Sequence, residues 1–149
     1  MRKTLGVAMA VVLGQAVEAQ TTMPQYEVDP SWPKPLPHRW VLGGLGGVCV
    51  DAQDHVFILN RQDVLEGDLN AGSLAPSIIE FDRAGNVVNS WGDPDLIDPR
   101  LHGCHFDKDN NVWMASAPSG MVQKYSHDGE LLFQIGTKGV FDSSDGTVD

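Results

Sequence analysis

The chain has 149 residues, 42% of them hydrophobic, and a formal net charge of −10 at pH 7. An acidic chain of this kind argues against a nucleic-acid partner, because such binding depends on neutralising phosphates with basic side chains. The 16 glycines and 9 prolines are typical of a turn-rich, all-β globular protein.

The first 19 residues have the pattern of a secretory signal peptide. Arg2 and Lys3 give a positive start, residues 5–13 form an apolar stretch too short to span a bilayer, and Ala19 suits a cleavage site. No later segment of the sequence could span a membrane. We therefore expect a secreted or periplasmic protein.

Residues 20–46 are rich in proline and are expected to form an extended leader, with a short strand at 26–28. The chain has two cysteines, Cys49 and Cys104. Export permits a disulfide between them, but two buried thiols fit the sequence at least as well.

A repeated pattern begins at residue 47. Residues 47–57 align without gaps on 103–113, and residues 79–92 align on 123–136. The first offset is 56 residues and the second is 44, so the first copy carries an insertion of 12 residues, which lies within 62–75. Each copy has four short segments of strand character, separated by turn residues. The predicted strands are 47–51, 55–60, 77–82 and 87–91 in the first copy, and 103–107, 111–116, 121–126 and 131–135 in the second.

A four-stranded antiparallel unit of this length is characteristic of a β-propeller blade. We predict an all-β propeller with blade one at 47–92, blade two at 93–136, and a loop at 137–149 that leads toward a third blade. Six such blades would need about 260 residues. The chain is therefore expected to be an N-terminal fragment of a longer protein, and closure of the ring by oligomerisation is the alternative.

The two copies differ at two polar positions that the propeller topology brings to one end of the ring. His102 precedes the first strand of blade two where blade one has Gly46, and Arg61 follows the second strand of blade one where blade two has Ala117. The insertion at 62–75 is expected on the same rim. These residues predict a binding site around the mouth of the central channel.

Ordinary structural roles are the alternatives at each of these positions. Arg61 could pair with a nearby carboxylate, and His102 could make only a hydrogen bond. His105 is expected to form a hydrogen bond between blades. The remaining histidines are expected to be solvated; they are His38, His55 and His127. The nearby carboxylates are Asp63, Glu66 and Asp68.

The motif Gly-hydrophobic-x-hydrophobic-Asp occurs at 47–51 and again at 103–107. With the paired second halves of the copies, it resembles the pattern of NHL-repeat propellers. Within that group the chain most resembles peptidyl-α-hydroxyglycine α-amidating lyases, over about residues 43–139. The most specific segments are 47–48, 59–63 and 101–104.

This resemblance implies specific roles and a reaction. His102 falls on a zinc-ligand position, Arg61 on the catalytic arginine, and Val48 and Cys104 on positions whose backbone carbonyls bind calcium. The implied enzyme is a zinc-dependent carbon–nitrogen lyase that splits a peptidyl-α-hydroxyglycine into a peptide amide and glyoxylate. The family's other zinc ligands would lie beyond Asp149, so the fragment alone is expected to be inactive.

A function of another class is the alternative. A non-catalytic NHL propeller would bind peptide or protein partners on the same rim. A sugar or lactone hydrolase on a similar propeller would need a cluster of Glu, Asp and Asn ligands, which the starts of these blades do not offer. The oligomeric state is not determined by the sequence.

Overall fold

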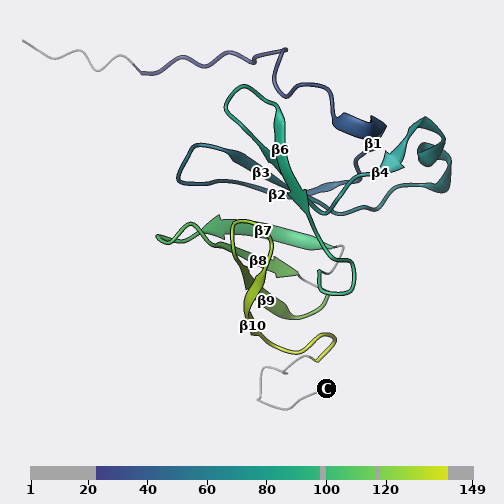
Figure 1. The fold of residues 1–149 in the computed structure, drawn as a ribbon, viewed down its shortest axis with the longest axis vertical. Helices are drawn as coiled ribbons and strands as arrows, with labels where there is room; N and C mark the ends of the chain where they lie inside the picture. Colours follow the sequence, from purple (N-terminus) through teal and green to yellow (C-terminus); the bar gives the residue numbers. More distant parts are fainter. Residues whose placement is uncertain (1–22, 98–99, 117, 141–149) are drawn as a thin grey trace, which may run out of the picture.

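The computed structural model describes residues 23–97, 100–116 and 118–140. These residues form two four-stranded antiparallel sheets, which Figure 1 shows packed against each other. The signal peptide expected at 1–19 and most of the loop expected at 137–149 lie outside the described residues. The all-β fold class is confirmed, and each sheet has the form of a propeller blade.

Blade one contains β2 (Leu45–Val50), β3 (Val56–Asn60), β5 (Ile78–Phe81) and β6 (Val87–Trp91), hydrogen-bonded in that order. The turn between β2 and β3 is closed by Asp51, whose Oδ1 accepts hydrogen bonds from the backbone N–H groups of Gln53 and His55. An aspartate that binds its own following backbone in this way is a common turn former.

Blade two repeats this arrangement with β7 (Leu101–Phe106), β8 (Val112–Ser116), β9 (Met121–Tyr125) and β10 (Leu131–Ile135). Asp107 closes the first turn here, because its Oδ1 accepts hydrogen bonds from the backbone N–H groups of Asp109 and Asn111. The eight strands of the two blades lie within two residues of their predicted bounds.

The innermost strands β2 and β7 lie side by side and are joined by a disulfide between Cys49 and Cys104, with 5.8 Å between their Cα atoms. The sequence left open whether these cysteines are two free thiols or a disulfide, and the structure contains the disulfide. An apolar core fills the space between the blades; its buried members are Phe57, Leu59, Ile78, Ile97, Leu101, Val112, Met114 and Tyr125.

The leader packs on the outer face of blade one. Trp32 contacts Phe81, with ring centroids 5.6 Å apart, and further leader residues cover the same apolar cluster. The strand expected at 26–28 is wrong, since these residues are exposed and have no strand partner. The leader instead contains the 3₁₀ turn η1 (Pro37–Arg39) and β1 (Trp40–Val41).

Strand β1 pairs in parallel with β4 (Ser73–Leu74), a short strand within the insertion. The insertion also contains the 3₁₀ turn η2 (Glu66–Ala71). The sequence pattern does not predict this pairing. It ties the insertion to the leader, away from the junction of the two blades (Figure 1).

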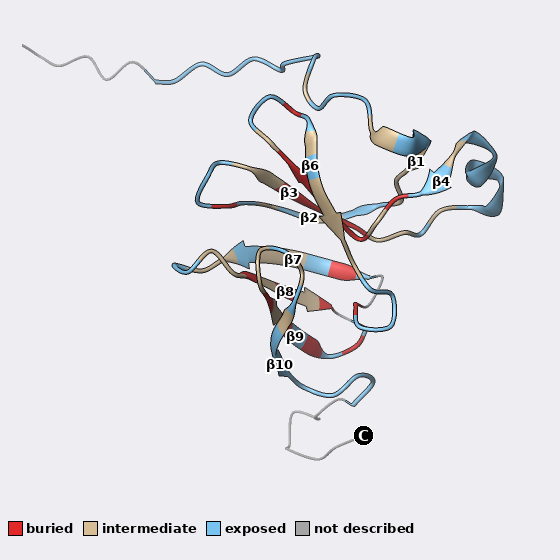
Figure 2. Cartoon of the chain, viewed as in Figure 1, coloured by how far each residue is buried: buried red, intermediate tan, exposed pale blue. Residues whose placement is uncertain are grey.

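Burial follows from this layering, as Figure 2 shows. All four residues of β5 are buried, because blade two covers one face of blade one and the leader covers the other. Four of the five residues of β10 are exposed, since this outermost strand has no further layer against it in the described chain. The described helical segments are short 3₁₀ turns, and none has the length and apolar character of a membrane span.

Candidate functional site

A cavity of about 460 Å³ opens at the ends of the strands where the sequence predicts a site, and its lining consists of Arg61, Arg100, His102 and Pro118. Arg61 directly follows β3 of blade one, and His102 is the second residue of β7 in blade two. The expected convergence of Arg61 and His102 at one end of the blades is therefore present.

Arg61 is held by bonds that leave part of its guanidinium uncommitted. Its backbone N–H donates to the carbonyl of Gly44 at 2.9 Å, and its Nε donates to the carbonyl of Leu101 at 3.3 Å. Within the described ranges, no carboxylate lies at ion-pair distance from Arg61. The terminal Nη groups therefore remain available to an anion in the cavity.

Two of the three neighbouring acids that could have paired with Arg61 accept hydrogen bonds from backbone N–H groups instead. Asp63 accepts a hydrogen bond from the backbone N–H of Gly44, and Asp68 accepts one from the backbone N–H of Leu65 at 3.0 Å. The alternative in which Arg61 makes an ordinary surface ion pair is therefore wrong for the described chain.

Gly46, the repeat partner of His102, has a steric reason to be glycine. A Cβ atom at this position would collide with the carbonyl group of Leu101, which passes directly over it. Strand β7 therefore excludes any side chain at Gly46. His102 has no strand above it among the described residues, and its side chain is exposed. Because blade one has Gly46 where blade two has His102, only blade two places an imidazole at the cavity from this position.

Among the described residues, no metal-ligand set surrounds His102. One group of His, Cys, Asp or Glu in that part of the chain could hold an ion, and His102 is not in it. A zinc site takes at least three protein ligands. Zinc at His102 and calcium at the carbonyls of Val48 and Cys104 stay predictions.

The insertion does not reach the cavity, contrary to expectation. It folds onto the leader: Ala75 N–H donates to the carbonyl of Val41 at 3.0 Å, and Ser73 Oγ donates to the carbonyl of His38 at 3.2 Å. The expectation that residues 62–75 contribute to the site on this rim is therefore wrong for the described chain. Strand β1 of the leader pairs with β4 of the insertion and holds the insertion away from the cavity. The sequence pattern does not reveal this pairing.

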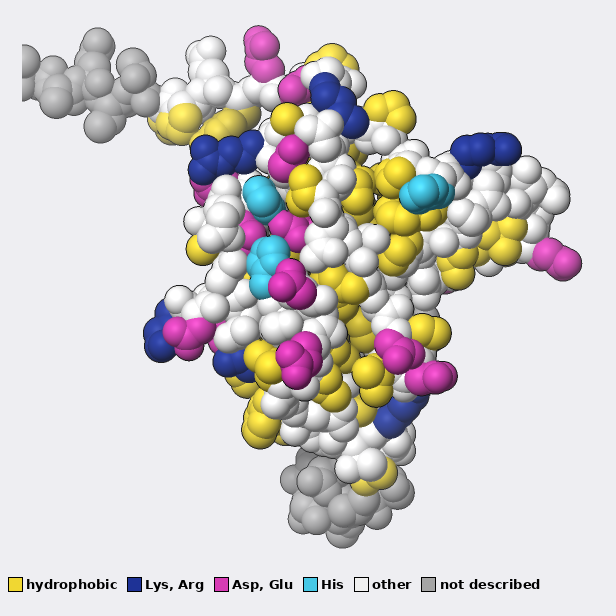
Figure 3. All heavy atoms as spheres, viewed as in Figure 1, with side chains coloured by type: hydrophobic (Ala, Val, Ile, Leu, Met, Phe, Trp, Pro, Cys, Tyr) yellow, Lys and Arg dark blue, Asp and Glu magenta, His cyan; other side chains and the backbone are white. Residues whose placement is uncertain are grey.

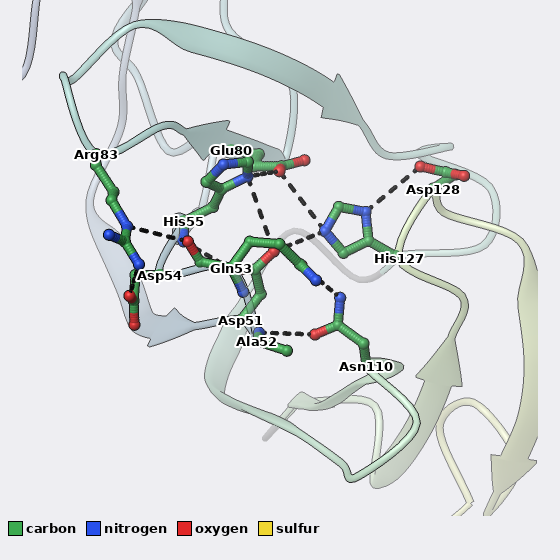
Figure 4. A network of polar contacts seen from close by, with 10 residues as sticks. All are labelled: Asp51, Ala52, Gln53, Asp54, His55, Glu80, Arg83, Asn110, His127 and Asp128. Atoms are coloured by element: carbon green, nitrogen blue, oxygen red, sulfur yellow. Dashed lines mark hydrogen bonds and ion pairs between the residues drawn. The ribbon is translucent and has the colours of Figure 1, made fainter.

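A second polar cluster lies at the other end of β2 and β3, between the blades (Figure 4). His127 Nε2 lies 2.9 Å from Asp51 Oδ2 and 3.6 Å from Glu80 Oε1, and His55 Nδ1 lies 2.6 Å from Glu80 Oε1. The side chains of Asp51 and Glu80 are buried. The expectation that His55 and His127 are solvated is wrong, because these hairpin turns pack against each other.

The electrostatics of this cluster favour its charged forms. Burial disfavours the imidazolium of His127, but the hydrogen bond to Asp51 and the charge of Glu80 outweigh it, so the pKa of His127 is raised. Burial likewise disfavours the carboxylate of Asp51, but hydrogen bonds from His127 and from backbone N–H groups lower its pKa. Repeat comparison could have found the cluster, since Glu80 aligns with Lys124 and His55 with Asn111.

His105 differs from its expected role. It is exposed and lies on the outer face of blade two, beside Trp113 and Met114. The described part of the chain provides no hydrogen-bond partner for it, so the expected bond between blades is absent there.

Comparison with solved structures finds proteins of similar fold. No family model and no curated protein matches the chain. Among solved structures, the selenomethionine-substituted virginiamycin B lyase from Staphylococcus aureus is similar, with 14% sequence identity and a TM-score of 0.45. The likeness covers 70% of this chain but only 33% of that protein, so the chain spans about a third of its length. The blades are identified by their four-stranded antiparallel sheets.

Proposed function

We propose that the chain is part of an exported propeller of the amidating-lyase type, which acts on a peptidyl-α-hydroxyglycine. The cavity at Arg61 and His102 would receive the carboxylate end of this substrate. One observation carries the proposal: the Arg61 guanidinium lines the cavity and has no carboxylate partner among the described residues. The Cys49–Cys104 disulfide is compatible with an oxidising, extracellular compartment.

The geometry suits Arg61 for binding a carboxylate. The Leu101 carbonyl occupies Nε and orients the planar guanidinium, while the two Nη groups can form a fork toward two oxygens. In the proposed reaction the hydroxyl proton leaves, the carbon–nitrogen bond breaks, and the amide nitrogen gains a proton. The products are a peptide amide and glyoxylate. Arg61 would fix the carboxylate that remains on glyoxylate.

The metals of this proposal do not fit the described residues alone. His102 offers one nitrogen, and two carbonyls, from Val48 and Cys104, fall short of the six to eight oxygens that calcium takes. Zinc at His102 and calcium at the two carbonyls are therefore proposed by resemblance. No step of the reaction is assigned to either ion here.

The absence of a ligand set around His102 among the described residues favours a second candidate. The same cavity could bind the C-terminal carboxylate of a peptide without any reaction. Both candidates need Arg61, but only the lyase releases glyoxylate.

The test is to incubate the full-length protein, of which the chain is proposed to be part, with Zn²⁺ and a synthetic peptidyl-α-hydroxyglycine and to measure glyoxylate. The lyase predicts release that Arg61→Ala abolishes. Arg83→Ala is the matched control, because Arg83 is exposed and already paired with Asp54. Substrate binding without glyoxylate would support the second candidate. Neither binding nor release would contradict both.

A further inference from the structure

Two buried carboxylates share a small space at the junction of the blades. The side chains of Asp51 and Glu80 are 0% and 4% exposed, and one ligand atom from each lies within 4.8 Å of the other and of a ring nitrogen of His127. Figure 3 shows histidine and acidic side chains together on this face. Buried like charges so close to each other require a counter-charge, which either protonated His127 or a bound cation supplies.

Blade two balances the charge at the equivalent positions in a different way. Its equivalent residues are Asp107 and Lys124, and Lys124 Nζ lies 2.8 Å from Asp107 Oδ2. That blade therefore holds one anion and one cation at these positions. Blade one replaces the lysine with Glu80 and so concentrates two negative charges. The two blades have the same strand and turn arrangement, so the turn itself does not require this replacement.

The distances around His127 suit a tetrahedral metal ion. Zinc with bonds of about 2.0–2.1 Å holds neighbouring ligand atoms about 3.3 Å apart. His127 Nε2 lies 2.9 Å from Asp51 Oδ2 and 3.6 Å from Glu80 Oε1, on either side of that value. The donor set of one imidazole and two carboxylates is one that zinc accepts in proteins.

The other groups in the cluster hold these ligands in place. His55 Nδ1 lies 2.6 Å from Glu80 Oε1, and Asp51 Oδ1 accepts the backbone N–H of His55 at 2.7 Å. Asn110 of blade two bonds to the same turn through the backbone N–H of Ala52 at 2.9 Å. Carboxylate ligands of metals are commonly fixed by such outer hydrogen bonds.

We infer that Asp51, Glu80 and His127 form a Zn²⁺ site that links blade one to blade two. His55 acts as a positioning residue for Glu80. The site lies at the opposite end of β2 from the cavity at Arg61 and His102, and the inference does not depend on the proposed function. Its role would be structural, since a metal that binds the folded chain and not the unfolded chain stabilises the fold.

The test measures zinc affinity by competition with a chromophoric chelator and thermal stability with Zn²⁺ or EDTA. A His102→Ala background removes the other proposed zinc ligand, so zinc retained there belongs to the junction. Glu80→Lys rebuilds the Asp107–Lys124 pair in blade one and should weaken zinc binding at least about 100-fold. His55→Asn copies Asn111 and should weaken it about 10- to 100-fold, as loss of an outer partner does.

A second variant that removes a zinc ligand keeps the test decisive if Glu80→Lys fails to fold. His127→Arg copies Arg83 and supplies a permanent cation to both carboxylates without a metal-ligating nitrogen. Zinc should raise the melting temperature of the His102→Ala protein and leave both junction variants unchanged. If the His102→Ala protein binds no zinc, or if Glu80→Lys and His127→Arg bind it equally well, the cluster is only a set of protonated ion pairs and the inference fails.

Discussion

Arg61 Nε donates a hydrogen bond to the carbonyl oxygen of Leu101 across 3.3 Å, although 40 positions separate the two residues in sequence. The bond connects the end of β3 in blade one with the start of β7 in blade two, one residue before His102. It fixes the Arg61 guanidinium at the cavity and leaves its Nη groups for a ligand. The candidate site therefore depends on how closely the two inner strands approach.

Gly46→Ala should disturb this approach. The added Cβ would collide with the backbone carbonyl of Leu101, which cannot rotate away as a flexible side chain could. Forced overpacking of this kind costs about 1–3 kcal/mol in the free energy of unfolding. Urea denaturation of the variant and wild type measures the loss.

Gly67→Ala is the matched control for that substitution. Gly67 lies in η2, where an added Cβ meets no atom within 4 Å. We expect a change of less than about 0.5 kcal/mol, as for most surface substitutions. Equal stability of the Gly46 and Gly67 variants would contradict the close packing of β2 and β7.

The disulfide should contribute much of the stability of the two-blade unit. Cys49 and Cys104 are 55 residues apart, so their bond removes many conformations of the unfolded chain. Replacing both cysteines by serine should lower the free energy of unfolding by about 2–5 kcal/mol. Wild-type protein treated with a reductant should unfold at the same urea concentration as the double variant. A midpoint equal to that of the oxidised wild type would show that the bond is not formed.

Tyr125 gives a test of the core between the blades. Its hydroxyl is buried without a hydrogen-bond partner among the described residues, so Tyr125→Phe should leave the free energy of unfolding at pH 7 unchanged or raise it by up to about 1 kcal/mol. Burial raises the pKa of Tyr125 to about 12, from an ordinary value of 10. The unfolded chain therefore releases this proton first.

Stability of the wild type should fall as the pH rises from 10 toward 12, because ionisation of Tyr125 favours the unfolded state over that range. The phenylalanine variant lacks this contribution and should lose less stability. Circular dichroism melts across this pH range measure the difference. Identical alkaline profiles for the two proteins would contradict the burial of the hydroxyl.

Much of the fold could be predicted because the strand pattern is local and is written twice. Alternation in residues 87–91 and 131–135 and the turn aspartates Asp51 and Asp107 place the strands of both blades. The repeat also identified Arg61 and His102 as differences between the copies. The same comparison contained Glu80 against Lys124, but the contact of that position with His127 depends on how the blades pack.

The leader was the part that sequence could not place. The pairing of β1 with β4 joins two-residue strands 33 positions apart, Trp40 with Ser73 and Val41 with Leu74. Strands this short carry no periodicity of their own. Their pairing is decided by the tertiary contacts of the leader with blade one, and it redirects the insertion away from the cavity.

The most direct test of the site is calorimetric titration of the chain with a peptide that ends in a free glycine carboxylate and with the same peptide as its amide. If Arg61 binds the carboxylate, the acid should bind at least about 10-fold more tightly than the amide, as expected for a charge-assisted hydrogen bond. Arg61→Ala should abolish this preference, while Arg83→Ala keeps it. Equal affinity of the wild type for acid and amide, or a preference that survives Arg61→Ala, would contradict the account.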